Sequence, residues 1–354
     1  MGRPLSYCQA LNEALHQAME ADPCVILMGE GVTDPRAVFG STAGLQEQFG
    51  EARVFDIPLS ENGMTGVMVG AALTGLRPVM THQRVDFMLY AMDQLVNHAA
   101  KRCYSSGGRQ CVPLTIRAVV GRGWGQGSQH SQSLQAWLAH IPGLKVVMPS
   151  TPYDAKGLLL AAIADPNPVI CIEHRQLYET VGDVPEEAYR ETLGVGVVRH
   201  PGSDVTLVAF SQMLAEVWRA LPTLEAAGIS VEVIDPRTVK PVDEELIVAS
   251  VQKTGRLVIA DTGWAICGLS AEIAALVAER AFHALKAPIR RVALPDVPTP
   301  TSYVLESRFY PGPLEIAQAV FEVMGRDGAA RSASDMAERH WRTERSERMF
   351  VGPF

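Results

Sequence analysis

A carboxylate stands at the start of an expected helix that is rich in small residues. The run Val54-Phe55-Asp56 predicts a strand, and Glu61 follows it, just before a helix over Gly63 to Gly75. Open parallel sheets bind ligands at the carboxyl ends of their strands, so Glu61 lies where a carboxyl could exchange a proton with a bound molecule. The structural alternative for Glu61 is a helix cap or a partner of the helix dipole.

A second candidate for proton chemistry is His130, because imidazole gains or loses a proton near neutral pH. It follows a glycine-rich loop that runs from Gly121 to Gly127. The loop lacks the Lys-Ser/Thr pair of a P-loop and does not follow a Rossmann first strand, so it fits no phosphate-binding motif. A histidine that only satisfies hydrogen bonds within its loop is the structural alternative.

The cysteines do not have the spacing of a metal or redox motif. No Cys-x-x-Cys pair occurs among the six, which are Cys8, Cys24, Cys103, Cys111, Cys171 and Cys267. No histidine follows them at zinc-binding spacing. We therefore expect buried, reduced thiols.

Composition restricts the class of protein. The 354 residues are 47% hydrophobic and 20% charged, which is typical of a soluble globular chain of two or three domains. Lys and Arg total 31 against 39 Asp and Glu, and the net charge of −8 argues against broad binding to nucleic acid or to an anionic membrane. No apolar run is long enough to span a membrane, and the start does not resemble a signal peptide, so we expect a cytoplasmic protein.

The elements that must position Glu61 and His130 alternate between short β-rich runs and helical periods. This alternation predicts α/β domains in which parallel sheets lie between helices, in three layers. In the first half we expect strands at 24–28, 54–56, 78–80, 112–119, 146–148 and 169–172, with helices at 5–20, 42–48, 63–75, 86–105 and 153–164. In the second half we expect strands at 205–210, 229–234, 257–260 and 289–293, with helices at 214–226, 244–251, 270–282 and 313–324.

Four segments follow from this pattern. We predict a first domain over 1–180, an irregular polar linker over 181–203, a second domain over 204–325 and a charged extension over 326–354.

Several long motifs carry a resemblance to a known family. They are Asp56-Ile57-Pro58-Leu59-Ser60-Glu61, Gly70-Ala71-Ala72-Leu73-Thr74-Gly75-Leu76-Arg77-Pro78, Asp93-Gln94-Leu95-Val96-Asn97, Gln129-His130-Ser131-Gln132-Ser133, His140-Ile141-Pro142-Gly143-Leu144-Lys145-Val146-Val147, Asp165-Pro166-Asn167-Pro168, Glu232-Val233-Ile234-Asp235-Pro236-Arg237-Thr238 and Asp296-Val297-Pro298-Thr299-Pro300. Together they resemble the β subunit of thiamine-diphosphate-dependent 2-oxo acid dehydrogenases of the pyruvate, branched-chain and acetoin type, from about residue 5 to 323.

The resemblance implies a transketolase-like pyrimidine-binding domain followed by a transketolase C-terminal domain. It also implies that the cofactor, thiamine diphosphate, lies between subunits, with the diphosphate and Mg²⁺ held by an α chain through a Gly-Asp-Gly motif. That motif is absent here, as expected for a β chain. A heterotetramer of two α and two β chains, which can serve a lipoyl acyltransferase core, is the implied assembly.

Three residues match positions that hold the aminopyrimidine ring in the family. Glu61 matches the glutamate that shares a proton with a ring nitrogen, Phe87 the aromatic residue that stacks on the ring, and Leu59 a residue that packs on it. Core packing is the structural alternative for Phe87.

Three more residues lie near the implied cofactor. Glu30 matches an acid close to the cofactor and the subunit interface, and His130 matches the histidine that faces the substrate or the incoming lipoyl group. Tyr90 replaces a glutamine that is common near the cofactor.

A further family feature is a loop that binds a structural potassium ion. Its oxygens would come from Ala162, Ile163, Asp165 and Asn167, and a plain turn is the alternative.

The chain departs from the family at an implied substrate entrance. His82 stands where relatives have other residue types, and Arg122 and Trp124 add bulk and charge to a loop that is nearly all glycine in relatives. We hypothesise that these residues reshape the entrance for an unusual 2-oxo acid or acceptor, and neutral drift on an exposed loop is the alternative.

The leading interpretation is a β subunit that, with an α subunit, decarboxylates a 2-oxo acid and transfers the acyl group to lipoyl-lysine. The alternative enzyme is the β half of a free-standing thiamine-diphosphate enzyme that passes the acyl carbanion to another small acceptor. A non-catalytic scaffold is disfavoured because Glu61 and Phe87 are both present.

Overall fold

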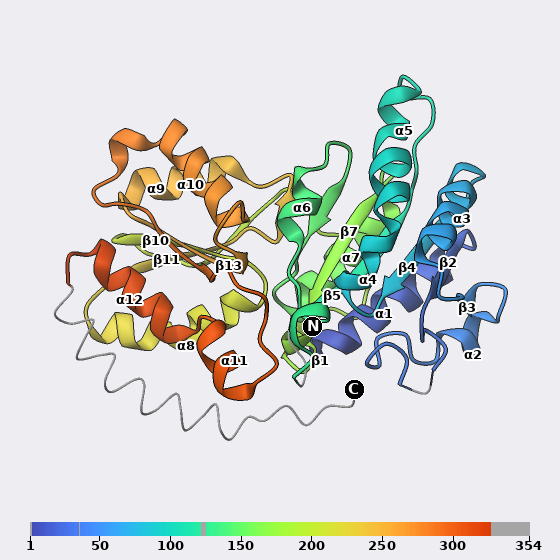
Figure 1. Cartoon of the computed structure of the whole chain (residues 1–354), viewed down its shortest axis with the longest axis horizontal. Coiled ribbons are helices and arrows are strands. Elements are labelled where there is room, and N and C mark those ends of the chain that lie inside the picture. Colours follow the sequence, from blue (N-terminus) through green and yellow to red (C-terminus); the bar gives the residue numbers. More distant parts are fainter. Residues whose placement is uncertain (1, 35, 122–124, 327–354) are drawn as a thin grey trace. The chain divides into compact units, whose positions relative to one another are not determined.

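A computed structural model describes residues 2–34, 36–121 and 125–326, which form two units (Figure 1). The first unit takes in the described residues of 1–121, 129–194 and 238–241, and the second those of 122–128, 195–237 and 242–354. Each unit is a mainly parallel sheet with helices packed on it. The predicted α/β class is therefore confirmed.

The first unit is built on a sheet of seven strands in the order β12-β6-β7-β5-β4-β2-β3, in which only β12 runs antiparallel to its neighbour. Its strands are β2 (Val25–Gly29), β3 (Val54–Asp56), β4 (Arg77–His82), β5 (Thr115–Val120), β6 (Lys145–Val147), β7 (Val169–His174) and β12 (Thr238–Lys240). A separate antiparallel pair joins β1 (Arg3–Ser6) to β8 (Val181–Val184).

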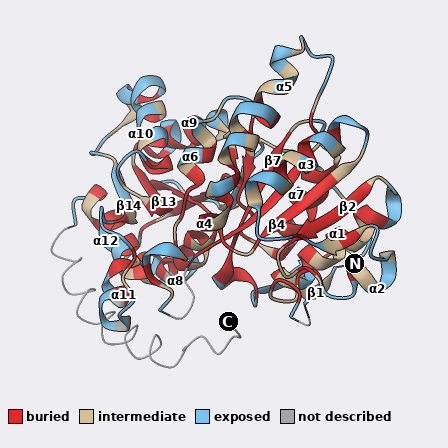
Figure 2. Cartoon of the chain, turned by 45° about the vertical axis from the view of Figure 1, so that its right-hand side comes forward, coloured by how far each residue is buried: buried red, intermediate tan, exposed pale blue. Residues whose placement is uncertain are grey.

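Two groups of helices pack in this unit. In one, α1 packs against α7, and in the other α3 packs against the helical segments η1 and η2 that follow β4. The helical elements are α1 (Tyr7–Ala21), α2 (Leu45–Phe49), α3 (Glu61–Leu73), α4 (Val85–Met88), η1 (Leu89–Ala91), η2 (Gln94–Ala99), α5 (Ala100–Ser105), η3 (Gly127–Gln129), α6 (Gln135–His140), α7 (Pro152–Ala164) and η4 (Arg175–Leu177). Figure 2 shows the strands buried beneath helices whose outer faces are exposed.

Local sequence explains where the main helices begin. Ser6 and Gln9 form a capping box at the start of α1, and the side chain of Thr151 accepts from the backbone of Asp154 at the start of α7. Every residue of the central strands β2 and β5 is buried because both faces of these strands are covered.

The second unit is a five-stranded sheet in the order β14-β13-β10-β11-β9, with β9 antiparallel. Its strands are β9 (Val197–His200), β10 (Val205–Ala209), β11 (Val231–Asp235), β13 (Leu257–Trp264) and β14 (Arg290–Leu294). Its helices are α8 (Gln212–Ala226), α9 (Glu244–Thr254), α10 (Leu269–Arg280), η5 (Phe282–Ala284), α11 (Tyr303–Phe309) and α12 (Pro313–Val323). Figure 1 shows α9 and α10 on one face of this sheet and α8 and α12 on the other.

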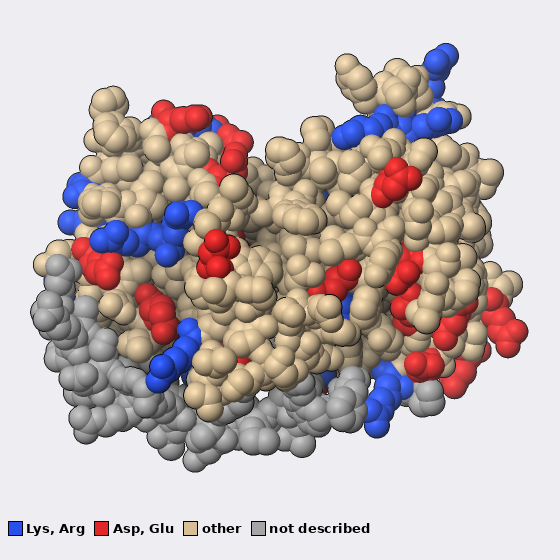
Figure 3. Space-filling view, in the orientation of Figure 1, with Lys and Arg blue, Asp and Glu red and all other residues tan. Residues whose placement is uncertain are grey.

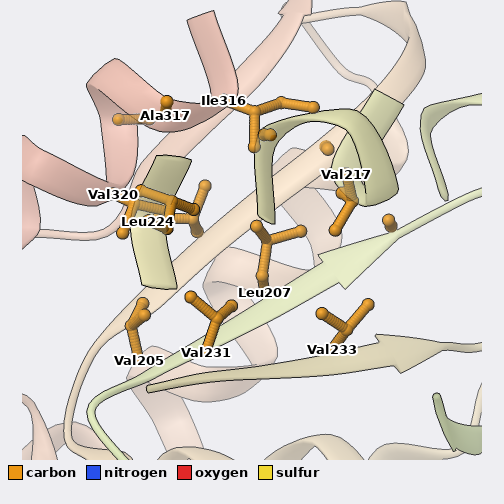
Figure 4. Close-up of a cluster of buried hydrophobic side chains, with 14 of the residues drawn as sticks. Val205, Leu207, Val217, Leu224, Val231, Val233, Ile316, Ala317 and Val320 are labelled. Carbon is orange, nitrogen blue, oxygen red and sulfur yellow. The ribbon is translucent and has the colours of Figure 1, made fainter. Parts of the chain in front are cut away.

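The core of the second unit lies between the sheet and the α8–α12 pair (Figure 4). Leu207 and Val231 point from neighbouring strands toward Val217 and Leu224 of α8 and Ile316 of α12. All five side chains are fully buried, so this layer is a dry apolar contact that stabilises the unit.

The structure differs from the sequence predictions in three places. The helix expected at 86–105 is divided into α4, η1, the π-helical η2 and α5. The segment 181–203, expected to be irregular, contains β8 and β9, and β12 from the second half of the chain joins the sheet of the first unit. Of the expected extension over 326–354, only Arg326 lies within the described residues, and the domain boundaries stay predictions.

Candidate active site

Two carboxylates meet at the carboxyl ends of neighbouring parallel strands. In the register of β2 with β3, Gly29 lies opposite Asp56, so both strands end at the same edge. Glu30 directly follows β2. Glu61 is the first residue of α3, where the helix dipole favours a carboxylate. The backbone N–H of Ile57 donates to the carbonyl of Gly29 at 3.1 Å, which holds the β3–α3 segment beside Glu30.

The electrostatics of Glu30 show how close the two carboxyls are. Burial raises the pKa of Glu30, and the neighbouring carboxyl of Glu61 raises it further through its charge and a hydrogen bond, with a smaller effect from Asp56. A carboxyl with a raised pKa beside a second carboxyl is the arrangement expected of a site that moves protons. The register of two strands thus brings together Glu30 and Glu61, which the sequence separates by 31 positions.

The backbone at Glu30 is fixed by β4. The side-chain amide of Gln83 donates to the carbonyl of Glu30 at 3.0 Å. Gly31 adopts a positive φ of 71°, and a Cβ there would lie only 2.5 Å from the Gln83 amide nitrogen. Glycine is therefore required at position 31 both by conformation and by the close approach of Gln83.

A second pair of site residues, Phe87 and His130, is also in contact. The two rings meet edge to face, with centroids 5.4 Å apart and planes at 86°. Phe87 lies in α4 and His130 follows η3, and both are half-buried. The predicted ring-stacking residue and the predicted histidine are therefore in contact.

A hydrogen bond between Asp86 and Gln132 supports this ring contact. The Gln132 amide donates to the Asp86 carboxylate at 2.9 Å. Burial raises the pKa of Asp86, although the hydrogen bond from Gln132 opposes the shift. Sequence reasoning did not assign a role to either residue, and the only available signal was that each lies within two residues of Phe87 or His130.

Several buried polar atoms at this edge have no hydrogen-bond partner among the described residues. They are Glu30 Oε1 after β2, Thr81 Oγ1 and His82 Nε2 at the end of β4, Asp86 Oδ2 in α4 and Ser131 Oγ beside His130. Buried polar atoms are normally hydrogen-bonded, so these five unpaired ones fit a polar ligand with ring nitrogens and an amino group.

His82, predicted at a substrate entrance, is 3% exposed. Desolvation lowers its pKa to about 4, so the imidazole is neutral at physiological pH. His82 is therefore buried at the carboxyl end of β4 and does not lie on the surface of this chain. The other two entrance residues, Arg122 and Trp124, lie outside the described residues.

Leu59 and Tyr90 are largely exposed. Their exposed fractions are 84% and 71%, which is unusual for large apolar side chains beside a site. Their roles stay predictions.

The predicted potassium loop is engaged by cationic side chains. Arg77 donates to the carbonyl oxygens of Ile163 at 3.0 Å and of Asp165 at 3.3 Å, and the Asp165 carboxylate pairs with Lys145. The backbone of Asn167 donates to the same carboxylate at 2.9 Å. The positively charged side chains of Arg77 and Lys145 already contact these oxygens, and their charge disfavours the binding of a metal ion. The loop of residues 162–167 therefore fits the alternative of a plain turn.

The described part of the chain contains neither a metal-binding cluster nor a membrane-spanning helix. No group of three or more His, Cys, Asp or Glu side chains there is arranged to hold a metal ion. None of the helices in the same residues has the length and apolar character needed to cross a membrane.

The expectation of buried thiols is wrong for most of the cysteines, because Cys267 is exposed and only Cys171 is fully buried.

The sequence matches two families over most of its length. Residues 3–180 match the family described as "Transketolase, pyrimidine binding domain", and residues 194–316 match "Transketolase, C-terminal domain". The site described above lies within the first match.

Similar curated proteins come from Bacillus subtilis (strain 168). The chain is 42% identical to the acetoin:2,6-dichlorophenolindophenol oxidoreductase subunit beta over 92% of its own length and 98% of the relative. It is 41% identical to the pyruvate dehydrogenase E1 component subunit beta and 40% identical to the 2-oxoisovalerate dehydrogenase subunit beta, each over 90% of this chain and 98% of the relative.

Among solved structures, a split gene transketolase described as an inactive beta4 tetramer has the same fold, with a TM-score of 0.71 over 91% of this chain and 99% of that chain, at 22% identity. The fold of this solved structure agrees with the family that the sequence relatives indicate. The chain therefore belongs to the transketolase-like family of E1 β subunits of thiamine-diphosphate-dependent 2-oxo acid dehydrogenases.

Proposed function

We propose that this chain, together with an α subunit, decarboxylates a 2-oxo acid and transfers the acyl group to lipoyl-lysine. The observation that carries the proposal is the Glu30–Glu61 carboxyl pair at the carboxyl ends of β2 and β3. Relatives support it, since proteins 40–42% identical to this chain are the β subunits of an acetoin oxidoreductase, a pyruvate dehydrogenase and a 2-oxoisovalerate dehydrogenase.

The described residues fit the pyrimidine half of thiamine diphosphate. Glu61 would accept a hydrogen bond from, or share a proton with, a ring nitrogen, and Phe87 would stack on the ring. The unpaired atoms of Thr81, His82 and Ser131 supply further polar contacts on the same side of the sheet. When bound, thiamine diphosphate would supply a nucleophilic carbon and an electron sink for decarboxylation.

The proton chemistry of this chain centres on its two glutamates. Glu61 holds or releases a proton at its carboxyl oxygen as the bound ring requires. The pKa of Glu30 beside it is raised by burial and by the Glu61 carboxyl, so the two carboxyls titrate as a coupled pair. His130, held against Phe87, would orient the substrate carboxylate or donate a proton to the developing product.

The diphosphate and Mg²⁺ would be held by the α subunit. Exposed apolar side chains near the site support a partner: Leu59, Val67 and Tyr90 are each more than half exposed. We infer an assembly of two α and two β chains.

The experiment is carbon dioxide release from a panel of 2-oxo acids with thiamine diphosphate and Mg²⁺. The chain is assayed alone and co-expressed with an α subunit, using either a free lipoyl domain or an artificial dye as acceptor. We expect activity only with the α subunit and efficient acylation of the lipoyl domain. Activity of the complex that ignores the lipoyl domain would contradict the proposed acceptor, and activity of this chain alone would contradict the proposed division between subunits.

A further inference from the structure

Two cysteine sulfurs approach each other across an exposed loop. The thiol of Cys111 donates a weak hydrogen bond to the sulfur of Cys103, with 3.5 Å between the two Sγ atoms. Cys103 lies in α5 and Cys111 lies between α5 and β5. A disulfide has its sulfurs roughly 2.05 Å apart, so bond formation needs a closing movement of only about 1.5 Å.

The end of α5 explains why the sulfurs meet. The backbone N–H of Gly108 donates to the carbonyl of Cys103 at 2.8 Å, and that of Gly107 to the carbonyl of Tyr104 at 3.0 Å. Gly107 and Gly108 both have a positive φ, of 64° and 79°. This pattern is a Schellman motif, which reverses the chain and returns it over the last turn of the helix.

The returning chain is held in place by Ser106. Its hydroxyl accepts the backbone N–H of Gln110 at 3.0 Å, one residue before Cys111. Residues 107–110 are exposed, whereas both cysteines are half-buried. The loop is thus ordered by local hydrogen bonds and open to small solutes.

We propose that Cys103 and Cys111 are a redox-active dithiol, which a hydroperoxide converts into an intramolecular disulfide. In the first step the Cys103 thiolate attacks a peroxide oxygen, so that an S–O bond forms, the O–O bond breaks and hydroxide leaves. In the second step Cys111 gives its proton to that hydroxide and attacks the Cys103 sulfur, forming the S–S bond and expelling the second hydroxide. That hydroxide takes up the proton that Cys103 released, so two thiols are oxidised while hydrogen peroxide is reduced to two waters.

The hydrogen bond distinguishes the two sulfurs. Because Cys111 donates to Cys103, that bond raises the pKa of Cys111, so the first attack is assigned to Cys103. Lys101, Arg102 and Arg109 flank the pair in the sequence, and Figure 3 shows basic side chains gathered over α5 and its loop.

The other cysteines serve as internal comparisons. Cys267 is exposed, and its sulfur makes no hydrogen bond to another cysteine among the described residues. Cys171 is fully buried, and desolvation raises the pKa of its thiol. Cys267 should therefore react with an oxidant but form no internal bridge, and Cys171 should not react.

A peptide map of the full-length chain tests the proposal. Trypsin cuts after Arg102, Arg109 and Arg117, so Cys103 and Cys111 fall in separate peptides, 103–109 and 110–117. After treatment with hydrogen peroxide and alkylation of the remaining thiols, we expect these two peptides to be linked and to separate on reduction with dithiothreitol. The oxidised chain should also melt about 2–5 °C higher than the reduced chain.

Single variants separate the roles of the two sulfurs. In Cys111→Ser, a 1,3-diketone probe for sulfenic acid should label Cys103, whereas in Cys103→Ser it should leave Cys111 unlabelled. Cys24→Ser is the matched control and should give the linked peptides in full yield. The proposal is overturned if native chain shows no linked peptides while Cys267 is fully oxidised, or if chain unfolded in urea forms the link as readily as folded chain.

Discussion

The imidazole of His130 meets the phenyl ring of Phe87 edge to face, with the centroids 5.4 Å apart. One ring comes from the segment after β4 and the other from the segment after β5, so two neighbouring strands of the sheet define the contact. An aromatic edge contact of this kind contributes about 0.5–1.5 kcal/mol beyond the burial of area. Phe87 is therefore held by His130 on one side and can present its ring to a bound pyrimidine.

Replacing Phe87 with Leu should weaken thiamine diphosphate binding by about 2- to 12-fold, since the aromatic contribution of roughly 0.5–1.5 kcal/mol is lost. The measurement is calorimetric titration of the cofactor into the complex with the α subunit. Phe49→Leu, in α2, is the control and should bind the cofactor normally. Unchanged affinity in Phe87→Leu would remove this residue from the cofactor site.

The Asp86–Gln132 hydrogen bond predicts that substitutions at its two ends reduce the decarboxylation rate by different amounts. Gln132→Leu removes the donor and should lower the decarboxylation rate about 10-fold, because the loop that carries His130 loses its link to α4. Asp86→Asn keeps an acceptor oxygen, so its decarboxylation rate should fall by less than about 3-fold. Single-turnover decarboxylation in the complex measures both, with the exposed neighbour Gln129→Leu as control. Full activity in Gln132→Leu would show that the link has no part in positioning His130.

The stability of the chain should depend on pH through His82. Its folded pKa is about 4 and its unfolded pKa about 6.5, so the unfolded state binds the extra proton and stability falls as pH drops from about 6.5 to 4. Protonation of His82 in the unfolded state should make the free energy of unfolding about 2 kcal/mol lower at pH 5 than at pH 7.5. Urea unfolding at the two pH values should show this loss in the parent chain but not in His82→Leu, while the exposed control His283→Gln behaves as the parent. Equal pH dependence in the parent and His82→Leu would contradict the burial of the imidazole.

A buried ion pair beneath the site should matter for folding. Arg117 and Glu173 are fully buried and joined at 2.6 Å, and Arg117 also donates to Ser41 in the segment between Glu30 and α2. Glu173→Gln leaves an uncompensated buried guanidinium and should lower the free energy of unfolding by about 3–5 kcal/mol. The surface change Glu20→Gln should cost less than about 0.5 kcal/mol in the same denaturant titration. A loss below about 1 kcal/mol in Glu173→Gln would mean that the site does not depend on this pair.

Much of the fold and part of the site could be predicted from the sequence, because strand runs and their ends are local properties. Glu61 comes shortly after the predicted strand Val54-Phe55-Asp56, so its place at the carboxyl edge of a sheet is readable from the pattern. His130 is separated from β5 by a glycine-rich loop, so its position is not readable in the same way. The approach of Glu30 to Glu61 is different, because it depends on β2 pairing with β3 in a particular register.

The features that sequence reasoning missed are produced by tertiary contacts. The antiparallel pairing of β12 with β6 and the burial of His82 come from contacts between segments far apart in the chain. The Cys103–Cys111 contact depends on a helix end built by two glycines in a left-handed conformation, which no cysteine spacing rule encodes. The exposure of Leu59 and Tyr90 likewise depends on how the chain folds and is not encoded in the local sequence pattern.

The measurement that tests the account most directly compares the parent and Glu61→Gln in the complex with the α subunit. Decarboxylation of the best 2-oxo acid, thiamine diphosphate affinity and melting temperature are measured on the same preparations. Because Gln keeps the shape of the side chain but cannot share a proton in the same way, we expect the rate to fall by at least about 100-fold while affinity and melting temperature change little. Decarboxylation at the parental rate in Glu61→Gln would contradict the claim that this chain supplies the proton-handling carboxyl of the site.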